Sequence, residues 1–302
     1  MFITTTRRNF LKRAAGAGLA LGAVGLTWPA AAANELFFDI SLAEWSLHRA
    51  LQSGALDHLD FPQTTRERFG IGAVEYVSKF FKSTDADYLD QLKQRCADHN
   101  VRSVLIMVDG EGSLADLDAA RRGQAVANHR RWVDAARHLG CHSIRANAYG
   151  EGTAEQVQEA AVDGLSRLTE YGAKQGVDVI VENHGGYSSV GSWLAGVIRR
   201  VDSPHCGTLP DFGNFHVREG ETYDRYKGVR ELMPWAKGVS AKAHEFDASG
   251  AEVNIDYRRM LRIVKEAGYT GHIGIEYEGG GVEVEGILAT KRLLEKVGRE
   301  LS

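Results

Sequence analysis

Short apolar runs alternate with amphipathic stretches along the chain from residue 34 onward. Most of these runs are dense in Val, Ile and Ala at successive positions, which is typical of parallel strands covered by helices. We expect strands over residues 38–46, 72–77, 103–109, 143–147, 177–183, 207–211, 239–244 and 272–277. The pattern therefore predicts eight parallel strands.

The stretches between these runs repeat their apolar residues at positions i, i+3, i+4 and i+7, as amphipathic helices do. The clearest cover residues 85–100, 114–139, 154–175, 256–267 and 284–301. Eight strand–helix units without a break predict an α/β fold, a single (β/α)8 TIM barrel over residues 34–302. A doubly wound open sheet is the alternative, but no Gly-x-Gly-x-x-Gly follows the first strand.

Composition and charge narrow the class of protein. The chain has 302 residues, of which 43% are hydrophobic and 25% charged, as in an ordinary soluble enzyme. A net charge of −4 and a pI near 6.3 do not favour nucleic acid or an anionic membrane as a partner. Cys96, Cys141 and Cys206 are scattered, so neither a disulfide framework nor a zinc finger is predicted.

The first 33 residues have the pattern of a targeting segment. Residues 6–12, Thr-Arg-Arg-Asn-Phe-Leu-Lys, resemble the twin-arginine export motif, and a stretch rich in Gly, Ala and Leu follows. That stretch is too short and too rich in glycine for a stable transmembrane helix. We therefore expect a periplasmic or exported protein, cleavage near Ala33, and no stable membrane span after the signal is removed.

Four residues stand at the ends of four consecutive predicted strands. Glu182, Asp211, His244 and Glu276 each follow a short run of apolar or small residues, at spacings of about thirty residues, the length of a βα unit. In a parallel barrel the strand ends converge on one mouth. Three carboxylates would repel one another there unless a cation neutralised them, and an imidazole is a further metal ligand, so the pattern predicts a divalent metal site.

Other polar and aromatic side chains share the inward face with these four, because side chains two residues apart on a strand point the same way. Lys242 lies inside an apolar strand, where burial lowers the pKa of a lysine toward values useful in catalysis. A lone glutamate at a strand end, such as Glu75 or Glu278, is more often a solvated loop residue. Trp45 fits a place in the core as well as it fits a surface on which a sugar stacks. The candidates are Trp45, Glu75, Asp109, Arg145, Asn147, His184, Lys242 and Glu278.

Four segments carry a resemblance to a known family. They are Val-Glu-Asn-His-Gly-Gly (181–186), Leu-Pro-Asp-Phe-Gly-Asn-Phe (209–215), Lys-Ala-His-Glu-Phe (242–246) and Gly-Ile-Glu-Tyr-Glu-Gly (274–279). In them the chain resembles the xylose isomerase-like, or AP-endonuclease-2-like, TIM barrels of the sugar phosphate isomerase/epimerase group. The resemblance extends from Ser41 to about Leu294, and it implies a barrel enzyme acting on a small carbohydrate.

In the ketose 3-epimerase branch of that family, a Glu, an Asp, a His and a Glu on strands five to eight hold one divalent ion. The resemblance implies these roles for Glu182, Asp211, His244 and Glu276, and Mn, Co, Zn and Mg all accept such ligands. It also implies that Glu182 and Glu276 exchange a proton with the sugar carbon beside the carbonyl. Lys242 is expected to assist as a third catalytic residue, with His184, Arg145, Asn147 and Trp45 contacting the substrate.

The chain departs from the epimerase pattern after its aspartate. Such epimerases usually have a histidine three residues after the metal-binding Asp, where this chain has Asn214, with His216 two positions further on. Both are expected to contact the substrate, but the departure leaves three functions open. The first is an isomerase or epimerase acting on an unphosphorylated sugar or keto-sugar; the others are a lyase or hydratase on 3-keto-glycosides and a sugar-binding barrel without catalysis.

The nucleolytic branch of the family uses three zinc ions and extra histidines on early strands. Here the early strand ends offer Asp109 and Asn147 instead, so DNA cleavage is disfavoured. Whether the protein forms a homo-oligomer is left open by the sequence.

Overall fold

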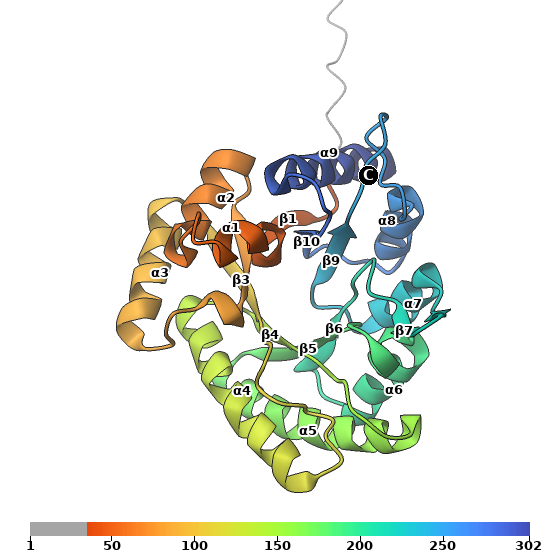
Figure 1. Cartoon of the computed structure of the whole chain (residues 1–302). Coiled ribbons are helices and arrows are strands. Elements are labelled where there is room, and N and C mark those ends of the chain that lie inside the picture. The colour runs from red at the N-terminus through yellow and green to blue at the C-terminus, as the bar shows by residue number, and fades with distance from the viewer. Residues whose placement is uncertain (1–34) are drawn as a thin grey trace, which may run out of the picture. The chain divides into compact units, whose positions relative to one another are not determined.

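The computed structural model describes residues 35–302, and it confirms the barrel (Figure 1). Eight parallel strands pair in the order β6-β5-β4-β3-β2-β1-β10-β9. Backbone bridges from Thr208 to Ala236 and from Asp211 to Ser240 join the two ends of that order, which closes the sheet. The predicted signal segment, residues 1–33, lies outside the described residues, so export stays a prediction.

The strands and helices have the following bounds. The barrel strands are β1 (Asp39–Ala43), β2 (Ala73–Val77), β3 (Arg102–Met107), β4 (Ser143–Ala146), β5 (Asp178–Glu182), β6 (Cys206–Leu209), β9 (Val239–Ala243) and β10 (His272–Tyr277). The helices are α1 (His48–Gln52), α2 (Phe61–Phe69), α3 (Ala86–Asp98), α4 (Ala119–Leu139), α5 (Ala154–Gln175), α6 (Gly191–Val201), α7 (Arg225–Leu232), α8 (Tyr257–Glu266) and α9 (Glu283–Leu301). A short hairpin, β7 (His216–Arg218) and β8 (Glu221–Thr222), follows β6.

Two boundaries differ from the predicted ones by more than two residues. The first strand ends at Ala43 instead of 46, because residues Glu44–Leu47 form a 3₁₀ turn, η1, in which the Glu44 carboxylate accepts a hydrogen bond from the backbone N–H of Val77. The fourth helix starts at Ala119 instead of 114, because the side chain of Asp118 accepts hydrogen bonds from the first backbone N–H groups of the helix and so caps it.

The interior of the barrel is divided between an apolar and a polar side. Residues paired in parallel register point to the same face, and Leu105, Ile180 and Leu209 form an apolar cluster inside the strands. Ser41, Glu75 and Ser240, from β1, β2 and β9, are buried polar residues. Ser41 donates a hydrogen bond to Glu75 at 2.5 Å, and the hydroxyl of Ser240 lies within hydrogen-bond distance of Asp211 and Glu276 at the mouth.

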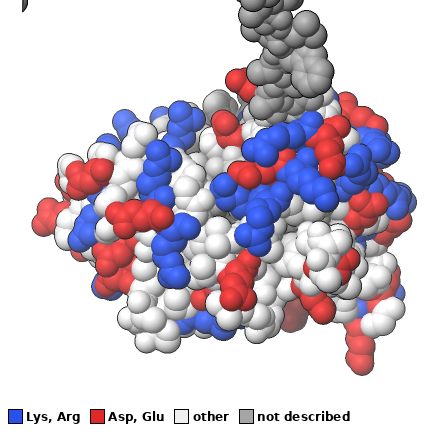
Figure 2. All heavy atoms as spheres, turned by 90° about the horizontal axis from the view of Figure 1, so that it is seen from above, with Lys and Arg blue, Asp and Glu red and all other residues white. Residues whose placement is uncertain are grey.

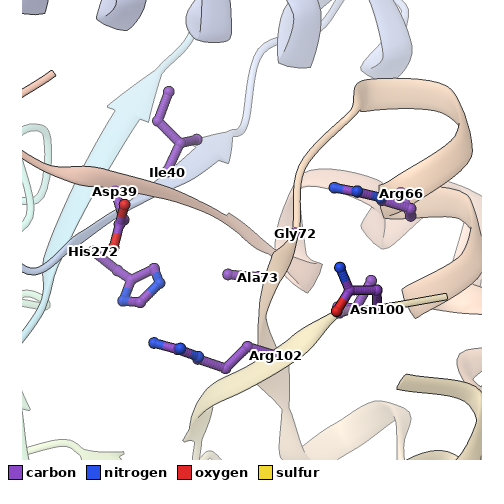
Figure 3. A pocket seen from close by; sticks show the side chains of 9 residues that line it. Asp39, Ile40, Arg66, Gly72, Ala73, Asn100, Arg102 and His272 are labelled. Atoms are coloured by element: carbon purple, nitrogen blue, oxygen red, sulfur yellow. The ribbon is translucent and has the colours of Figure 1, made fainter. Parts of the chain in front are cut away.

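A polar hollow lies at the end of the barrel where the strands begin. It has a volume of about 400 Å³ and is lined by Asp39, Arg66, Arg102 and His272 (Figure 3). The face in Figure 2 carries basic and acidic side chains side by side. Among the described helices, none combines the length and the apolar composition that a membrane span requires.

Candidate functional site

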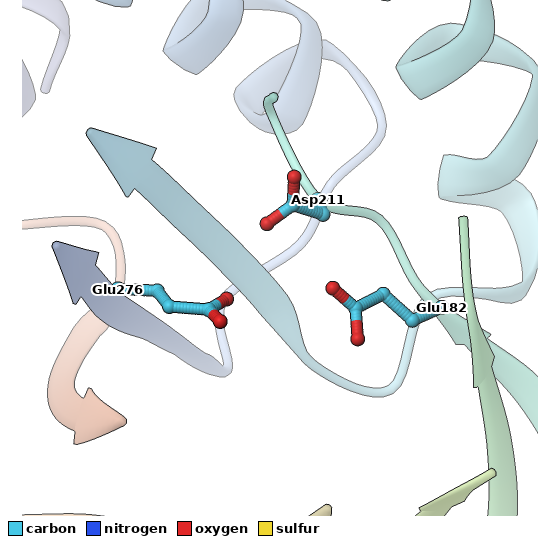
Figure 4. Close-up of side chains that lie close together, drawn as sticks. All are labelled: Glu182, Asp211 and Glu276. Carbon is cyan, nitrogen blue, oxygen red and sulfur yellow. The ribbon is translucent and has the colours of Figure 1, made fainter. Parts of the chain in front are cut away.

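Three carboxylates meet at the end of the barrel where the strands finish. Glu182 ends β5, Asp211 follows β6, and Glu276 lies near the end of β10; one oxygen of each lies within 4.8 Å of the others. Glu182 and Glu276 point toward one another from opposite sides, with Asp211 between them (Figure 4). Their exposed fractions are 1%, 0% and 4%, so the three acidic groups are almost fully removed from contact with solvent.

Hydrogen bonds from the backbone and from Ser240 fix Asp211 and Glu276. One oxygen of Asp211 accepts the N–H groups of Gly213 and Asn214, both at 2.7 Å. The hydroxyl of Ser240 lies 2.7 Å from the other oxygen of Asp211 and 2.6 Å from Oε2 of Glu276. Because a hydroxyl has one hydrogen, it can donate to one of these oxygens at a time, so a proton on one carboxyl group would complete the network.

Glu182 is held from two directions. The side-chain amide of Asn214 donates to its Oε1 at 2.9 Å, and Nε of Arg145 lies 2.9 Å from its Oε2. The contact with Arg145 is an ion pair without hydrogen-bond alignment, which leaves that buried oxygen of Glu182 without a hydrogen-bond donor. Arg145 is in turn held by Asp109 at 2.8 Å, and Asn147 donates to the same Asp109 oxygen at 2.9 Å.

The ammonium of Lys242 lies inside the carboxylate cluster. Its Nζ is 3.1 Å from Glu276, 2.9 Å from Glu278 and 4.0 Å from Asp211. Glu278 also accepts a hydrogen bond from the indole of Trp45 at 2.6 Å. Strand register explains the arrangement, because Lys242 on β9 pairs directly with Glu276 on β10 and Glu278 is two residues further along.

The electrostatics separate the carboxylates into two kinds. Burial raises the pKa of Glu182 to about 7, although the charge of Arg145 acts to lower it. Burial also raises the pKa of Asp211 to about 7, although the charge of Lys242 acts to lower it. Burial acts on Glu276 in the same direction, but the charge of Lys242 and the hydrogen bond from Ser240 outweigh it and lower its pKa. Without a bound cation, Glu276 is therefore the carboxylate that stays ionised most readily.

The expectation that Lys242 has a lowered pKa is wrong. Burial does act in that direction, but the charges of Glu276, Asp211 and Glu278 outweigh it and raise the pKa above its ordinary value. Lys242 is therefore a permanent positive charge in this structure.

The donor set fits a divalent cation. Two oxygens on opposite sides of a cation such as Mg²⁺ or Ca²⁺ lie about 4–5 Å apart, which matches the spacing of the three carboxylates. An oxygen of Glu182 is buried without a hydrogen-bond donor. Burial also disfavours the ionised form of all three carboxyl groups. A hard cation would satisfy both conditions, so Glu182, Asp211 and Glu276 are the residues that could hold it.

His244 does not belong to this group of three. It follows the last residue of β9, is half-buried, and lines a hollow of about 700 Å³ together with Glu278 and Arg292. Its backbone N–H is held by Glu252 at 3.2 Å. The predicted fourth metal ligand thus lies beside the cluster of carboxylates and not within it.

Three further residues were predicted to contact the substrate: His184, Trp45 and His216. His184 is exposed, and its pKa is lowered by partial burial of the ring and then by the charges of Arg145 and Lys242. Trp45 stacks on His48 with ring centres 4.8 Å apart. His216 is exposed at the start of the β7–β8 hairpin.

Ser240 is the residue of the site that the sequence analysis missed. It stands two positions before Lys242, on the same face of β9, and a lone serine on that face of an apolar strand was the available signal.

Comparison with known proteins identifies the fold family. The family model described as "Xylose isomerase-like TIM barrel" matches residues 66–297, which is most of the chain. The chain belongs to this family.

Solved structures of xylose isomerase-like barrels share the fold at low sequence identity. A xylose isomerase-like TIM barrel protein from Mycobacterium smegmatis in complex with magnesium has a TM-score of 0.66 and 15% identity, over 87% of this chain and 97% of that one. A D-tagatose 3-epimerase-like protein has a TM-score of 0.68 and 17% identity, over 86% of this chain and 97% of that one. At these identities the likeness shows a shared fold.

A curated relative matches over a short segment. The C-glycoside deglycosidase alpha subunit of Arthrobacter globiformis is 41% identical over 49 residues, which is 16% of this chain and 13% of that subunit. The chain thus covers only a small part of the length of this relative.

Proposed function

We propose that this protein is a divalent-metal-dependent isomerase or epimerase that acts on an unphosphorylated sugar or keto-sugar. The observation that carries the proposal is the meeting of Glu182, Asp211 and Glu276 within 4.8 Å, with the two glutamates approaching from opposite sides (Figure 4). Reversal of configuration beside a carbonyl needs one group to remove a proton and another to return it, and two opposed carboxylates can do both.

The residues of the chain divide the proton transfer between them. Lys242 keeps Glu276 ionised, so Glu276 is the group that accepts a proton from the sugar carbon. Glu182 lies across the site from Glu276 and is held by a hydrogen bond from Asn214, so it can return a proton on the opposite face. When bound, a divalent cation would polarise the sugar oxygens next to that carbon.

The positive charges at the mouth support a substrate without phosphate. In the described part of the chain, Arg145 and Lys242 are the two buried cations. Arg145 pairs with Glu182 and Asp109, and Lys242 pairs with Glu276 and Glu278. Each buried cation is therefore engaged by carboxylates of the protein, which favours a neutral sugar. Mn, Co, Zn and Mg are the candidate metals, and export by the twin-arginine route would place the reaction in the periplasm.

Proton exchange tests the proposal directly. Purified protein lacking residues 1–33 is analysed for bound metal and incubated with a panel of ketohexoses in D₂O, and deuterium entering beside the carbonyl is followed by NMR. We expect bound divalent metal and exchange that falls at least about a hundredfold in Glu276→Gln. The control is Glu219→Gln, an exposed glutamate of the hairpin, which should not change the rate. Metal-free protein, or an undiminished rate in Glu276→Gln, would refute the mechanism.

A second candidate keeps the same first step and changes its outcome. Proton removal beside the carbonyl of a 3-keto-glycoside can be followed by loss of the aglycone, which is lyase chemistry, or by addition of water. The segment shared with a deglycosidase subunit and the presence of Asn214 favour this candidate. Incubation with a 3-keto-glucoside separates the two: released aglycone indicates a lyase or hydratase, and a product with the mass of the substrate indicates an isomerase.

A further inference from the structure

A pocket of about 620 Å³ lies beside the proposed active site, between the loops that follow β4 and β5 and the β7–β8 hairpin. Tyr149, Tyr187, Val190, Trp193 and Val217 give it a largely apolar lining. That volume is within the range of pockets that hold small molecules. Tyr149 is 42% exposed, so part of its ring is open to solvent.

The aromatic wall of the pocket is rigid. The rings of Tyr187 and Trp193 are stacked with their centres 5.8 Å apart. The hydroxyl of Tyr187 donates to the carbonyl of Gly152, and the indole of Trp193 donates to the carbonyl of Ala154, both at 2.9 Å. Both rings are thus fixed to the loop after β4, so little conformational entropy is lost when a flat group packs on them.

The same loops that line the pocket also supply the polar residues of the site. Tyr149 follows Asn147 by two residues, and Gly186 follows His184 by two. An extended chain spans at most about 3.6 Å per residue, so in each loop the pocket begins within about 7 Å of a residue expected to contact the sugar. The pocket and the predicted sugar site therefore share two loops, and a group joined to a sugar in the site would extend along these loops toward the pocket.

We propose that this pocket is an aglycone subsite, which binds an aromatic group joined to the sugar that occupies the carboxylate site. The assignment rests on the proposed function, because it takes that sugar to be the reacting part of the molecule. An aromatic group fits better than a second sugar ring, since the lining is mostly apolar and its fixed rings offer a stacking surface. Because the proposed reaction removes a proton beside a carbonyl, the substrate class that follows is an aryl glycoside whose sugar ring carries a keto group.

Calorimetric titration of the protein with simple glucosides tests the subsite without any turnover. Phenyl β-D-glucopyranoside should bind at least about fivefold more tightly than methyl β-D-glucopyranoside. Tyr149→Ala and Tyr187→Ala should each remove most of this preference and leave the affinity for the methyl glucoside unchanged. Tyr171→Ala is the matched control, since Tyr171 lies on α5 and bonds Asp134 away from the pocket; it should keep the full preference.

Three results would overturn the subsite: equal binding of phenyl and methyl glucosides, binding of neither, or a preference that survives Tyr187→Ala. Cellobiose is titrated as well. If cellobiose binds more tightly than methyl β-D-glucopyranoside and phenyl β-D-glucopyranoside does not, an aromatic occupant is refuted. The proposed function is measured separately by deuterium exchange. Normal exchange without a phenyl preference refutes the subsite alone, and a phenyl preference without exchange refutes the enzymatic function alone.

Discussion

The ammonium of Lys242 lies 3.1 Å from a carboxylate oxygen of Glu276, and both side chains are almost fully buried. A buried lysine is stable only when it is paired, and here two of its three carboxylate partners, Asp211 and Glu276, could bind a metal. Lys242 therefore stabilises the cluster of negative charges when no cation is bound, and it keeps Glu276 ionised.

Replacing Lys242 with Met should destabilise the metal-free protein. Removing one partner from a buried ion pair leaves the other uncompensated, at a cost of about 3 kcal/mol or more. Added Mn²⁺ should then raise the Tm of Lys242→Met by more than it raises that of the wild type, because the cation replaces the lost charge. Thermal unfolding with chelator and with Mn²⁺ measures both effects.

The control for that variant is Lys237→Met, which removes a lysine paired with Asp178 at 2.8 Å away from the cluster. Its Tm should respond to Mn²⁺ as the wild type does. Equal stability of Lys242→Met and the wild type in chelator would show that Lys242 does not balance the carboxylates.

Metal binding should release protons below neutral pH. Glu182 and Asp211 have pKa values of about 7 in the metal-free protein, so at pH 6 they are largely protonated, and a metal ligand must be deprotonated. The apparent affinity for Mn²⁺ should therefore rise between pH 6 and pH 8 and then level off. Calorimetry in two buffers of different ionisation enthalpy counts the protons; a flat or falling affinity over this range would contradict the assignment, and Asp211→Asn should abolish binding.

The sequence predicted the fold and the three carboxylates because both follow from strand geometry. Consecutive parallel strands bring their ends to one mouth, so Glu182, Asp211 and Glu276 had to approach one another once the strands were located. His244 was harder to place, since it lies one residue beyond β9, where the loop sets the direction of the ring. The predicted direction of the pKa shift of Lys242 was wrong because the pattern of the sequence indicates that this residue is buried but does not show that Glu276 lies beside it on the neighbouring strand.

Gly274 should not tolerate a side chain. A Cβ at this position would lie 2.5 Å from a carboxylate oxygen of Glu75, inside the barrel and beneath the carboxylate cluster. Gly274→Ala should therefore reduce the free energy of unfolding by about 1–3 kcal/mol, as overpacking of a core does. Gly280→Ala is the matched control, because a Cβ there meets nothing within 4 Å. Urea unfolding of both variants measures the difference, and equal stability would mean that the barrel interior adjusts without cost.

Glu75 should make the stability of the protein fall as pH rises. Its carboxyl group is fully buried, accepts a 2.5 Å hydrogen bond from Ser41, and has a pKa raised from 4.5 to about 8, first by burial and also by the charges of Glu276 and Glu182. The folded protein keeps this proton up to about pH 8, whereas the unfolded chain releases it near pH 4.5. The protonated carboxyl group of Glu75 therefore makes its full contribution to the free energy of unfolding below pH 4.5. This contribution is lost as pH rises through 8.

Glu75→Gln isolates this effect, because an amide keeps the shape of the neutral acid and an oxygen for Ser41. At pH 5 the variant and the wild type should unfold with free energies within about 1 kcal/mol of each other. The variant should become progressively the more stable of the two up to pH 9, by at most about 5 kcal/mol at 1.36 kcal/mol per pKa unit. Urea unfolding in chelator across this range gives the comparison, with the exposed Glu219→Gln as control. A constant difference between the two proteins at every pH would show that Glu75 is already ionised in the fold.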